Sequence, residues 1–203
     1  MAQKLILALN NTKVTASYKN GPYKDKFKFT HYGVDMAAPD SSNKTIYASG
    51  TGILIAKGWD ENAGYVVVVK YPAAYNHKTR KYEDVIFRYY HLNSISENLP
   101  TGTNAITKDT VLGQYGGSGF GIMDKWKPHL HIEADTDTKY PCYSPTFSGS
   151  GSVIKGTSAG ANDSTCHSVL EYFHCKPSAP DNQTYTTTGD EFINVGDDSI
   201  PTV

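Results

Sequence analysis

Apolar and polar residues alternate, or apolar residues form short runs, along most of the first 135 positions, and this pattern predicts a chain rich in β-strands. The four consecutive valines from Val66 to Val69 are typical of a buried strand. Val85, Phe87, Tyr89 and His91 should share one face, because side chains two apart in a strand point the same way. Strands are predicted at 4–9, 13–18, 45–48, 52–58, 65–71, 84–92 and 130–134.

The segments between these strands contain turn signals and very little helix. Asn10-Asn11-Thr12 is expected to turn strand 4–9 back onto strand 13–18. Residues 19–30 are predicted to be an exposed loop. A short stretch, 168–173, is the one good helix candidate.

A length of 203 residues predicts one domain. We assign it to residues 1–176. Residues 144–165 are rich in Ser, Gly and Thr, and we expect a flexible insertion there. The segment 177–203 is polar and rich in Thr, Asp and Gly, so we expect a dispensable tail or a linker.

The net charge of the chain argues against some classes of binding partner. The net charge is −1 and charged residues make up 19%, so no basic field would hold the chain on nucleic acid or an anionic membrane. No apolar stretch approaches the roughly 20 residues of a membrane span. Leu5 to Leu9 is too short for the apolar core of a signal peptide, so no export signal is visible.

The three cysteines lie late in the chain, at Cys142, Cys166 and Cys175. In a reducing compartment they would be three thiols, whereas export would allow one disulfide and one odd thiol, and the sequence does not choose. Cys166, His167, His174 and Cys175 have the composition of a second zinc site but lack its usual spacing. A disulfide that uses Cys142, or buried thiols, is the preferred interpretation.

Histidine and aspartate recur in a pattern that suggests metal chemistry. His31 and Asp35 are four residues apart, but Gly33 argues against a helix, so a turn into a strand would have to bring them to one ion. His91 ends a predicted strand. Each of these features alone is weak, because a histidine at a strand end is usually structural.

A His-x-His pair adds to this pattern. His129 and His131 are two apart on a predicted strand and would share one face. One could bind a metal while the other handles a proton. Glu133 continues that face and could orient a metal ligand.

Together, in this order, the motifs are specific. The chain resembles the lysostaphin-like (LytM-type) peptidoglycan zinc metalloendopeptidases, which have His-x-x-x-Asp, then Tyr-His-Leu, then His-x-His. The resemblance is carried by 31–35, 90–92 and 129–131, together with 47–52, 64–68 and the glycine-rich 113–119, and it spans roughly residues 25–135.

This resemblance implies a fold and an activity. The fold would be mainly β, an antiparallel sheet with a substrate groove walled by loops and very little helix. One Zn²⁺ would be held by His31, Asp35 and His131, and His91 and His129 would be the catalytic, non-ligand histidines. The substrate would be a peptidoglycan stem or cross-link peptide. A monomer acting extracellularly or in the cell wall, secreted or delivered by a phage, is expected.

Two other functions compete with this one. A zinc D-Ala-D-Ala carboxypeptidase has a similar site, but its gap between histidine and aspartate is longer than the step from His31 to Asp35. A catalytically inactive module that binds cell wall or a protein partner would typically have lost one of the five residues, and all five are present. The cross-link could be glycine-rich or a direct D-Ala to diamino-acid bond.

Overall fold

The computed structural model describes residues 2–28, 30–39, 43–136, 144–147, 153–157, 165–177 and 191–194. The strands are β1 (Asn11–Ala16), β2 (Gly33–Ala37), β3 (Thr45–Tyr47), β4 (Ile53–Asp60), β5 (Gly64–Asn76), β6 (Lys81–Ile95), β7 (Val111–Tyr115), β8 (Leu130–Asp135), β9 (Ser144–Phe147), β10 (Val153–Thr157), β11 (Cys166–His167), β12 (Cys175–Pro177) and β13 (Glu191–Asn194). The helices are α1 (Gly21–Phe27) and the 3-10 turn η1 (Val169–Glu171).

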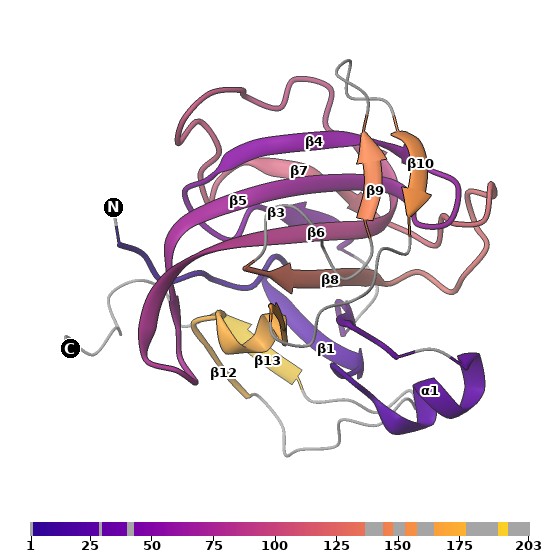
Figure 1. The fold of residues 1–203 in the computed structure, drawn as a ribbon, viewed down its shortest axis with the longest axis horizontal. Coiled ribbons are helices and arrows are strands. Elements are labelled where there is room, and N and C mark those ends of the chain that lie inside the picture. The colour runs from indigo at the N-terminus through magenta and orange to yellow at the C-terminus, as the bar shows by residue number, and fades with distance from the viewer. Residues whose placement is uncertain are drawn as a thin grey trace.

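Within the described residues, 11 of these strands form one antiparallel sheet in the order β12-β13-β1-β2-β8-β6-β5-β4. β7 pairs with β6 and β3, and β11 pairs with β8. The long strands β5 and β6 curve across the molecule, and the β9–β10 hairpin contacts β4 (Figure 1). The expected fold, mainly antiparallel β with very little helix, is confirmed.

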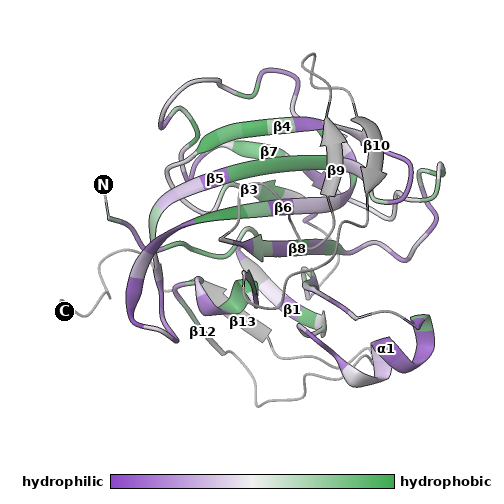
Figure 2. Ribbon diagram, viewed as in Figure 1, coloured by the Kyte–Doolittle hydropathy of each residue, from purple (hydrophilic) through white to green (hydrophobic). Residues whose placement is uncertain are grey.

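The alternation along β5 and β6 separates two faces of the sheet. Val67 and Phe87 belong to the main hydrophobic core, whereas Val68, Ile86 and Tyr90 form part of a smaller cluster on the opposite face. The central strands carry most of the hydrophobic residues and α1 is mostly hydrophilic (Figure 2). The β-strands from 45 to 134 predicted from the hydrophobic pattern therefore lie where expected, with longer bounds for β5 and β6.

The predicted hairpin of 4–9 with 13–18 is wrong. Leu5 and Leu7 are buried in the core, but their segment forms only isolated bridges, because its backbone bonds to several segments in turn. Ile6 donates to the Ser49 carbonyl, for example, and the Leu5 carbonyl accepts from His174. The second strand of the predicted hairpin is β1, which pairs with β2 and β13 instead.

The predicted exposed loop at 19–30 is also wrong in part, because it contains α1. The side chain of Asn20 accepts the Tyr23 N–H and caps the helix, a proline stands in its first turn, and Lys28 ends it in a left-handed conformation with φ 66°. The short helix expected at 168–173 is the single 3-10 turn η1.

The C-terminal segment contributes β13, which pairs with both β1 and β12. A truncation near Pro180 would therefore remove a strand of the sheet. The division into a domain at 1–176 and a tail at 177–203 stays a prediction, as does the flexibility of 144–165. That insertion contains β9 and β10, while 148–152 and 158–164 lie outside the described residues.

Cys166 is disulfide-bonded and Cys175 has a free thiol, whose pKa burial raises to about 12. Cys142 lies outside the described residues. Among the residues that are described, Cys166, His167, His174 and Cys175 form no cluster able to hold a metal.

No helix in the described part of the chain is long and apolar enough to cross a membrane.

Candidate active site

Two neighbouring strands bring the predicted metal ligands together. β2 pairs with β8 so that Asp35 lies directly opposite His131. Val34 and Ile132 point into the main core, so Asp35 and His131, one residue along each strand, point to the other face of the sheet. His31 precedes β2, and its Nδ1–H donates to the Ser17 carbonyl at 2.8 Å. This bond orients the His31 ring so that its Nε2 faces Asp35 and His131.

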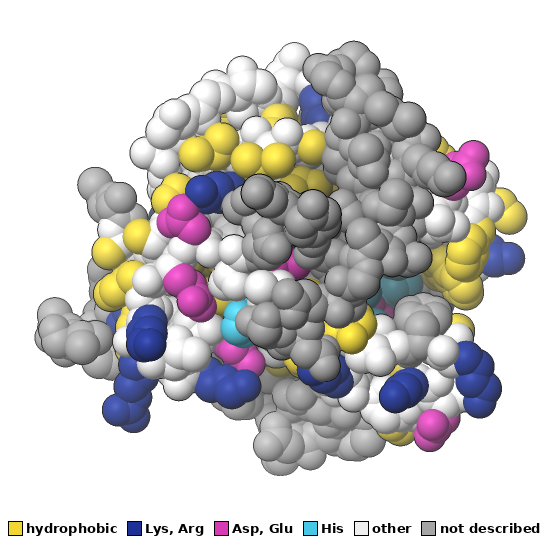
Figure 3. All heavy atoms as spheres, in the orientation of Figure 1, with side chains coloured by type: hydrophobic (Ala, Val, Ile, Leu, Met, Phe, Trp, Pro, Cys, Tyr) yellow, Lys and Arg dark blue, Asp and Glu magenta, His cyan; other side chains and the backbone are white. Residues whose placement is uncertain are grey.

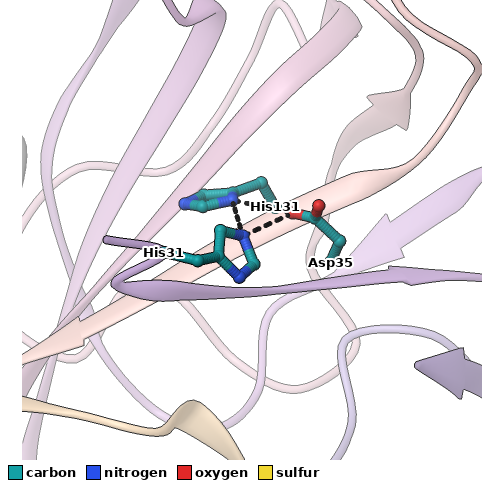
Figure 4. Close-up of side chains that lie close together, drawn as sticks. All are labelled: His31, Asp35 and His131. Carbon is teal, nitrogen blue, oxygen red and sulfur yellow. Dashed lines mark hydrogen bonds and ion pairs between the residues drawn. The ribbon is translucent and has the colours of Figure 1, made fainter. Parts of the chain in front are cut away.

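The ligand atoms of His31, Asp35 and His131 converge, as Figure 4 shows. His31 Nε2 lies 3.1 Å from Asp35 Oδ1 and 3.2 Å from His131 Nδ1, and His131 Nδ1 lies 2.8 Å from Asp35 Oδ1. All three residues are buried. His31 and Asp35 are four residues apart, a spacing that is common in helices. They nevertheless meet across the turn that leads into β2, as the sequence analysis expected.

Two carboxylates flank His131. Asp35 Oδ1 faces its Nδ1, and Glu133 Oε1 lies 3.3 Å from its Nε2. Burial alone would lower the pKa of His131, but its hydrogen bonds to these carboxylates and their charges raise it to about 9. Burial alone would raise the pKa of Asp35, but the neighbouring histidines His31, His129 and His131 hold it well below its usual value. Before a metal binds, these two carboxylates therefore favour the form of His131 that carries protons on both nitrogens.

The three residues fit a zinc ion. Imidazole nitrogens and a carboxylate oxygen are ligands that zinc takes, and a catalytic site uses three of them. Zinc bonds of about 2.0–2.1 Å place the ligand atoms of a tetrahedral site about 3.3 Å apart. The observed separations of 2.8 to 3.2 Å are close to that spacing. The cluster could therefore hold a metal with small outward movements.

His91 reaches this site through a β-bulge. The register between β5 and β6 shifts between Tyr65 and Val67, and His91 has a φ of 62°. Histidine is among the residues that adopt this left-handed conformation most readily. The bulge places His91 on the same face as Tyr90, with its ring 4.9 Å from that of His129. The prediction that His91 shares a face with Phe87 is therefore wrong.

The glycine-rich segment 113–119, predicted to be a loop, begins in β7 and holds the two remaining histidines. Gly116 donates its N–H to the His91 carbonyl and accepts the N–H of His129. A Cβ at Gly116 would collide with the side-chain oxygen of Asn93. The Ser118 carbonyl accepts the Nδ1–H of His91 at 2.8 Å. The space beside the Asn93 side chain therefore suits a glycine at position 116.

His91 and His129 are held in the same tautomer. His129 Nδ1 lies 2.7 Å from the Lys127 carbonyl, which can only accept a hydrogen bond, so Nδ1 carries the proton as it does in His91. This tautomer leaves Nε2 of each ring as the atom that can take up or give a proton, and that of His129 lies 3.8 Å from Asp35 Oδ1. Burial and the nearby His129 and His131 hold the pKa of His91 well below that of a free histidine. The structure brings all five predicted site residues together.

Two tyrosines that lie near the motifs in the sequence contact the site in ways that the sequence did not specify. Tyr23 stacks on His31 with ring centroids 4.1 Å apart. The Asn20-Gly21-Pro22 sequence, an N-cap followed by a proline, could have revealed the helix that positions it. Tyr90 stacks on His131 at 5.4 Å and donates its hydroxyl to Glu133 Oε2 at 3.3 Å. Glu133 thus contacts the His131 nitrogen that faces away from His31 and Asp35 and can orient the ring, as the sequence suggested.

Comparison with known proteins identifies a family. The model of Peptidase family M23 matches residues 29–141, a range that contains all five histidine and aspartate residues of the site. Among curated proteins, no sequence matches the chain significantly.

Several solved structures are similar in fold. One is a zinc-containing peptidase from Vibrio cholerae, with 20% identity and a TM-score of 0.48 over 66% of this chain and 37% of that one. A chain of the SpoIIIAH–SpoIIQ complex has 18% identity and a TM-score of 0.45, over 76% and 95%. Lysostaphin has 19% identity and a TM-score of 0.46, over 80% and 61%. The chain thus spans a little over a third of the Vibrio cholerae peptidase.

Proposed function

Because the chain belongs to Peptidase family M23, we propose that it is a zinc-dependent endopeptidase that hydrolyses amide bonds in the peptide cross-links of bacterial peptidoglycan. One observation carries the proposal. A buried cluster that could hold a metal lies directly beside two histidines whose Nδ1 atoms are each held by a backbone carbonyl.

His31, Asp35 and His131 are the proposed zinc ligands. The bound ion would polarise the scissile carbonyl and lower the pKa of a water to about 7. The outer partners of these ligands support the assignment. His31 is fixed by the Ser17 carbonyl and His131 by Glu133, and such contacts orient metal ligands and set their tautomers.

His91 and His129 would move the protons. Hydrolysis forms a bond from water oxygen to the carbonyl carbon and breaks the carbon–nitrogen bond, and a proton must pass to the leaving amine. The Nε2 of one histidine can take the proton of the attacking water. The other can donate to the developing oxyanion or to the amine. With an Nδ1–H locked onto a backbone carbonyl, each ring can do this without turning.

The net charge of the chain is −1, which gives it no strong preference for a highly charged substrate. Figure 3 shows acidic and basic side chains interspersed on the face that it presents. Action outside the cell or in the cell wall, and a monomeric state, are part of the proposal.

A turbidity assay tests the proposal. The purified protein should clear a suspension of isolated cell walls, a chelator should stop clearing, and added zinc should restore it. Clearing that persists in chelator after the metal has been removed would contradict a zinc mechanism.

A further inference from the structure

The connection from β7 to β8 carries an exposed apolar tip. Phe120 is 56% exposed, Ile122 53% and Met123 39%. Because these residues belong to one short segment, they form a patch, whereas single exposed apolar residues are common on any protein surface. At the right-hand edge of Figure 3, hydrophobic side chains gather with basic ones beside them. A patch of this kind marks a contact surface.

The backbone holds this tip in a fixed shape. Gly119 and Ile122 exchange two backbone hydrogen bonds, of 2.8 and 2.9 Å, around a two-residue turn. φ is 46° at Phe120 and 75° at Gly121, and positive values at both central positions are the signature of a type I′ turn. The Gly121 N–H also donates to the Glu61 carbonyl at 2.8 Å, which ties the tip to the turn between β4 and β5. A supported turn therefore presents the apolar side chains outward.

Phenylalanine is an unusual residue for this turn. A bulky side chain rarely adopts a left-handed backbone, and asparagine or glycine is the common choice there. Phe120 also gives little to the core, since more than half of its surface is exposed. A residue that is held against its backbone preference and outside the core is suited to a contact with another surface.

Basic side chains border the patch. The Trp126 ring is a neighbour of the rings of Phe120 and Phe27, at centroid distances of 5.6 and 6.4 Å, and so joins the tip to α1. Lys125 Nζ lies 5.9 Å from the Trp126 ring centroid. On α1, Lys26 Nζ lies 5.2 Å from that of Phe27. Lysine stems lie along apolar surface in this way while the ammonium groups stay in water.

The nearby acids do not cancel these two charges at the patch. Asp124 Oδ1 accepts from Asn93 Nδ2 at 3.5 Å and so faces β6. Asp25 lies two residues, or about 200° of helix, from the aromatic residue of α1 that contacts the tip, and points to the opposite side. Glu61 and Lys127 are both exposed and offset each other. Since salt screens charges beyond about 8 Å, these local groups matter more than the net charge of −1.

We propose that this tip docks the chain on a membrane surface that contains anionic phospholipid. Phe120, Ile122 and Met123 enter the boundary between headgroups and acyl chains, and Lys26 and Lys125 meet the lipid phosphates. Aromatic and aliphatic residues with lysines beside them favour this boundary. A second copy of the chain suits the tip less well, because like charges would face each other across the contact.

Docking would also place the candidate active site close to the membrane. His129 is three residues from Trp126, and the loop that bears the tip includes Ser118, whose carbonyl accepts from His91. The inference does not depend on zinc or on peptidase activity, and it requires no segment that spans the membrane. It concerns where the chain would work, whatever bond it cuts.

Flotation of the purified full chain with lipid vesicles tests the proposal. One set of vesicles contains phosphatidylcholine with phosphatidylglycerol, which is anionic, and the other contains phosphatidylcholine alone. The chain should bind the anionic vesicles about thirtyfold more tightly, or about 2 kcal/mol for two lysines near the surface, and salt should weaken the binding. Binding to neither set would overturn the proposal.

Matched double variants locate the contact. Phe120→Asn with Ile122→Thr removes the apolar tip and should weaken binding to the anionic vesicles by about thirty- to a hundredfold. Asparagine suits the left-handed backbone at this turn, so the variant should fold. Tyr82→Asn with Ile55→Thr changes two hydrophobic residues of β6 and β4 that are 48% and 50% exposed, and should bind like the wild type. Equal binding by the two double variants would overturn the proposal.

Lys125→Gln is a second variant at an exposed position outside the turn. It should weaken binding about fivefold, whereas Lys81→Gln, exposed at the start of β6, should not. In a Trp59→Phe background the fluorescence comes from Trp126 alone, and it should shift to shorter wavelength on binding and be quenched by brominated lipid. Unchanged emission on bound vesicles would show adsorption by charge alone and overturn the insertion. A dimer in lipid-free solution that the apolar double variant abolishes would assign the tip to a second copy, and would overturn the proposal as well.

Discussion

Zinc binding should displace a proton from His131. Asp35 and Glu133 accept from its two nitrogens and raise its pKa to about 9, so at pH 8 it should be about 90% protonated. A histidine with the ordinary pKa of about 6.5 would be only about 3% protonated at that pH. Because a zinc ligand must be deprotonated, binding at pH 8 should release about one proton from this residue.

The competition between zinc and protons for His131 also determines how the zinc affinity depends on pH. A raised pKa favours the protonated form below it, so the apparent affinity should fall as the pH is lowered through about 9. Each pH unit below that value should weaken the affinity about tenfold, or about 1.4 kcal/mol.

Calorimetric titration of the metal-free protein with zinc, in two buffers of different ionisation enthalpy, counts the protons released. Glu133→Gln removes one of the charges that raise the pKa of His131, so fewer protons should be released at pH 8. Glu97→Gln, at an exposed position, is the control. Release of almost no proton at pH 8 by the wild-type protein would refute the charge assignment of this cluster.

Four further predictions follow from the site. His31→Ala and His131→Ala should abolish both zinc retention and activity, and stoichiometric zinc in both variants would rule out these ligands. His91→Ala and His129→Ala should keep zinc but lower kcat by about 10²–10⁴-fold, and near wild-type turnover would remove that histidine from the mechanism. Gly116→Ala should keep zinc and lose roughly 10²-fold in kcat, because the added Cβ collides with the Asn93 side chain and would shift the backbone that bonds to both catalytic histidines. The rate should follow a bell-shaped pH profile with its optimum between about 7 and 9, and full activity at pH 5 with saturating zinc would contradict a zinc-bound water with a pKa of about 7 as the group that limits the acid side.

Only part of the site geometry could be predicted from local rules in the sequence. Side chains alternate on a strand, which places His131 and Glu133 on one face and Ile132 on the other. The meeting of His31 with His131, 100 residues away, followed from the family motifs and not from spacing. No periodicity in the sequence would have paired β2 with β8.

The missed features arise where tertiary contacts override a local pattern. Alternation along β6 predicted that His91 shares a face with Phe87, and a single bulge with a left-handed residue moves it to the other face. Leu5 and Leu7 are spaced as in a strand, but the backbone around them bonds to several partners in turn. The short helix that carries Tyr23 has a recognisable cap, but its seven residues contain no buried position to give an apolar pattern.

Digestion of purified peptidoglycan, with mass analysis of the new chain ends, tests the central claim most directly. The zinc-loaded protein should release new amino and carboxyl termini within the peptide cross-links, and the His129→Ala variant should release almost none. Intact cross-links after prolonged digestion with the zinc-loaded wild-type protein would contradict the account, and would indicate a module of the same fold without peptidase activity.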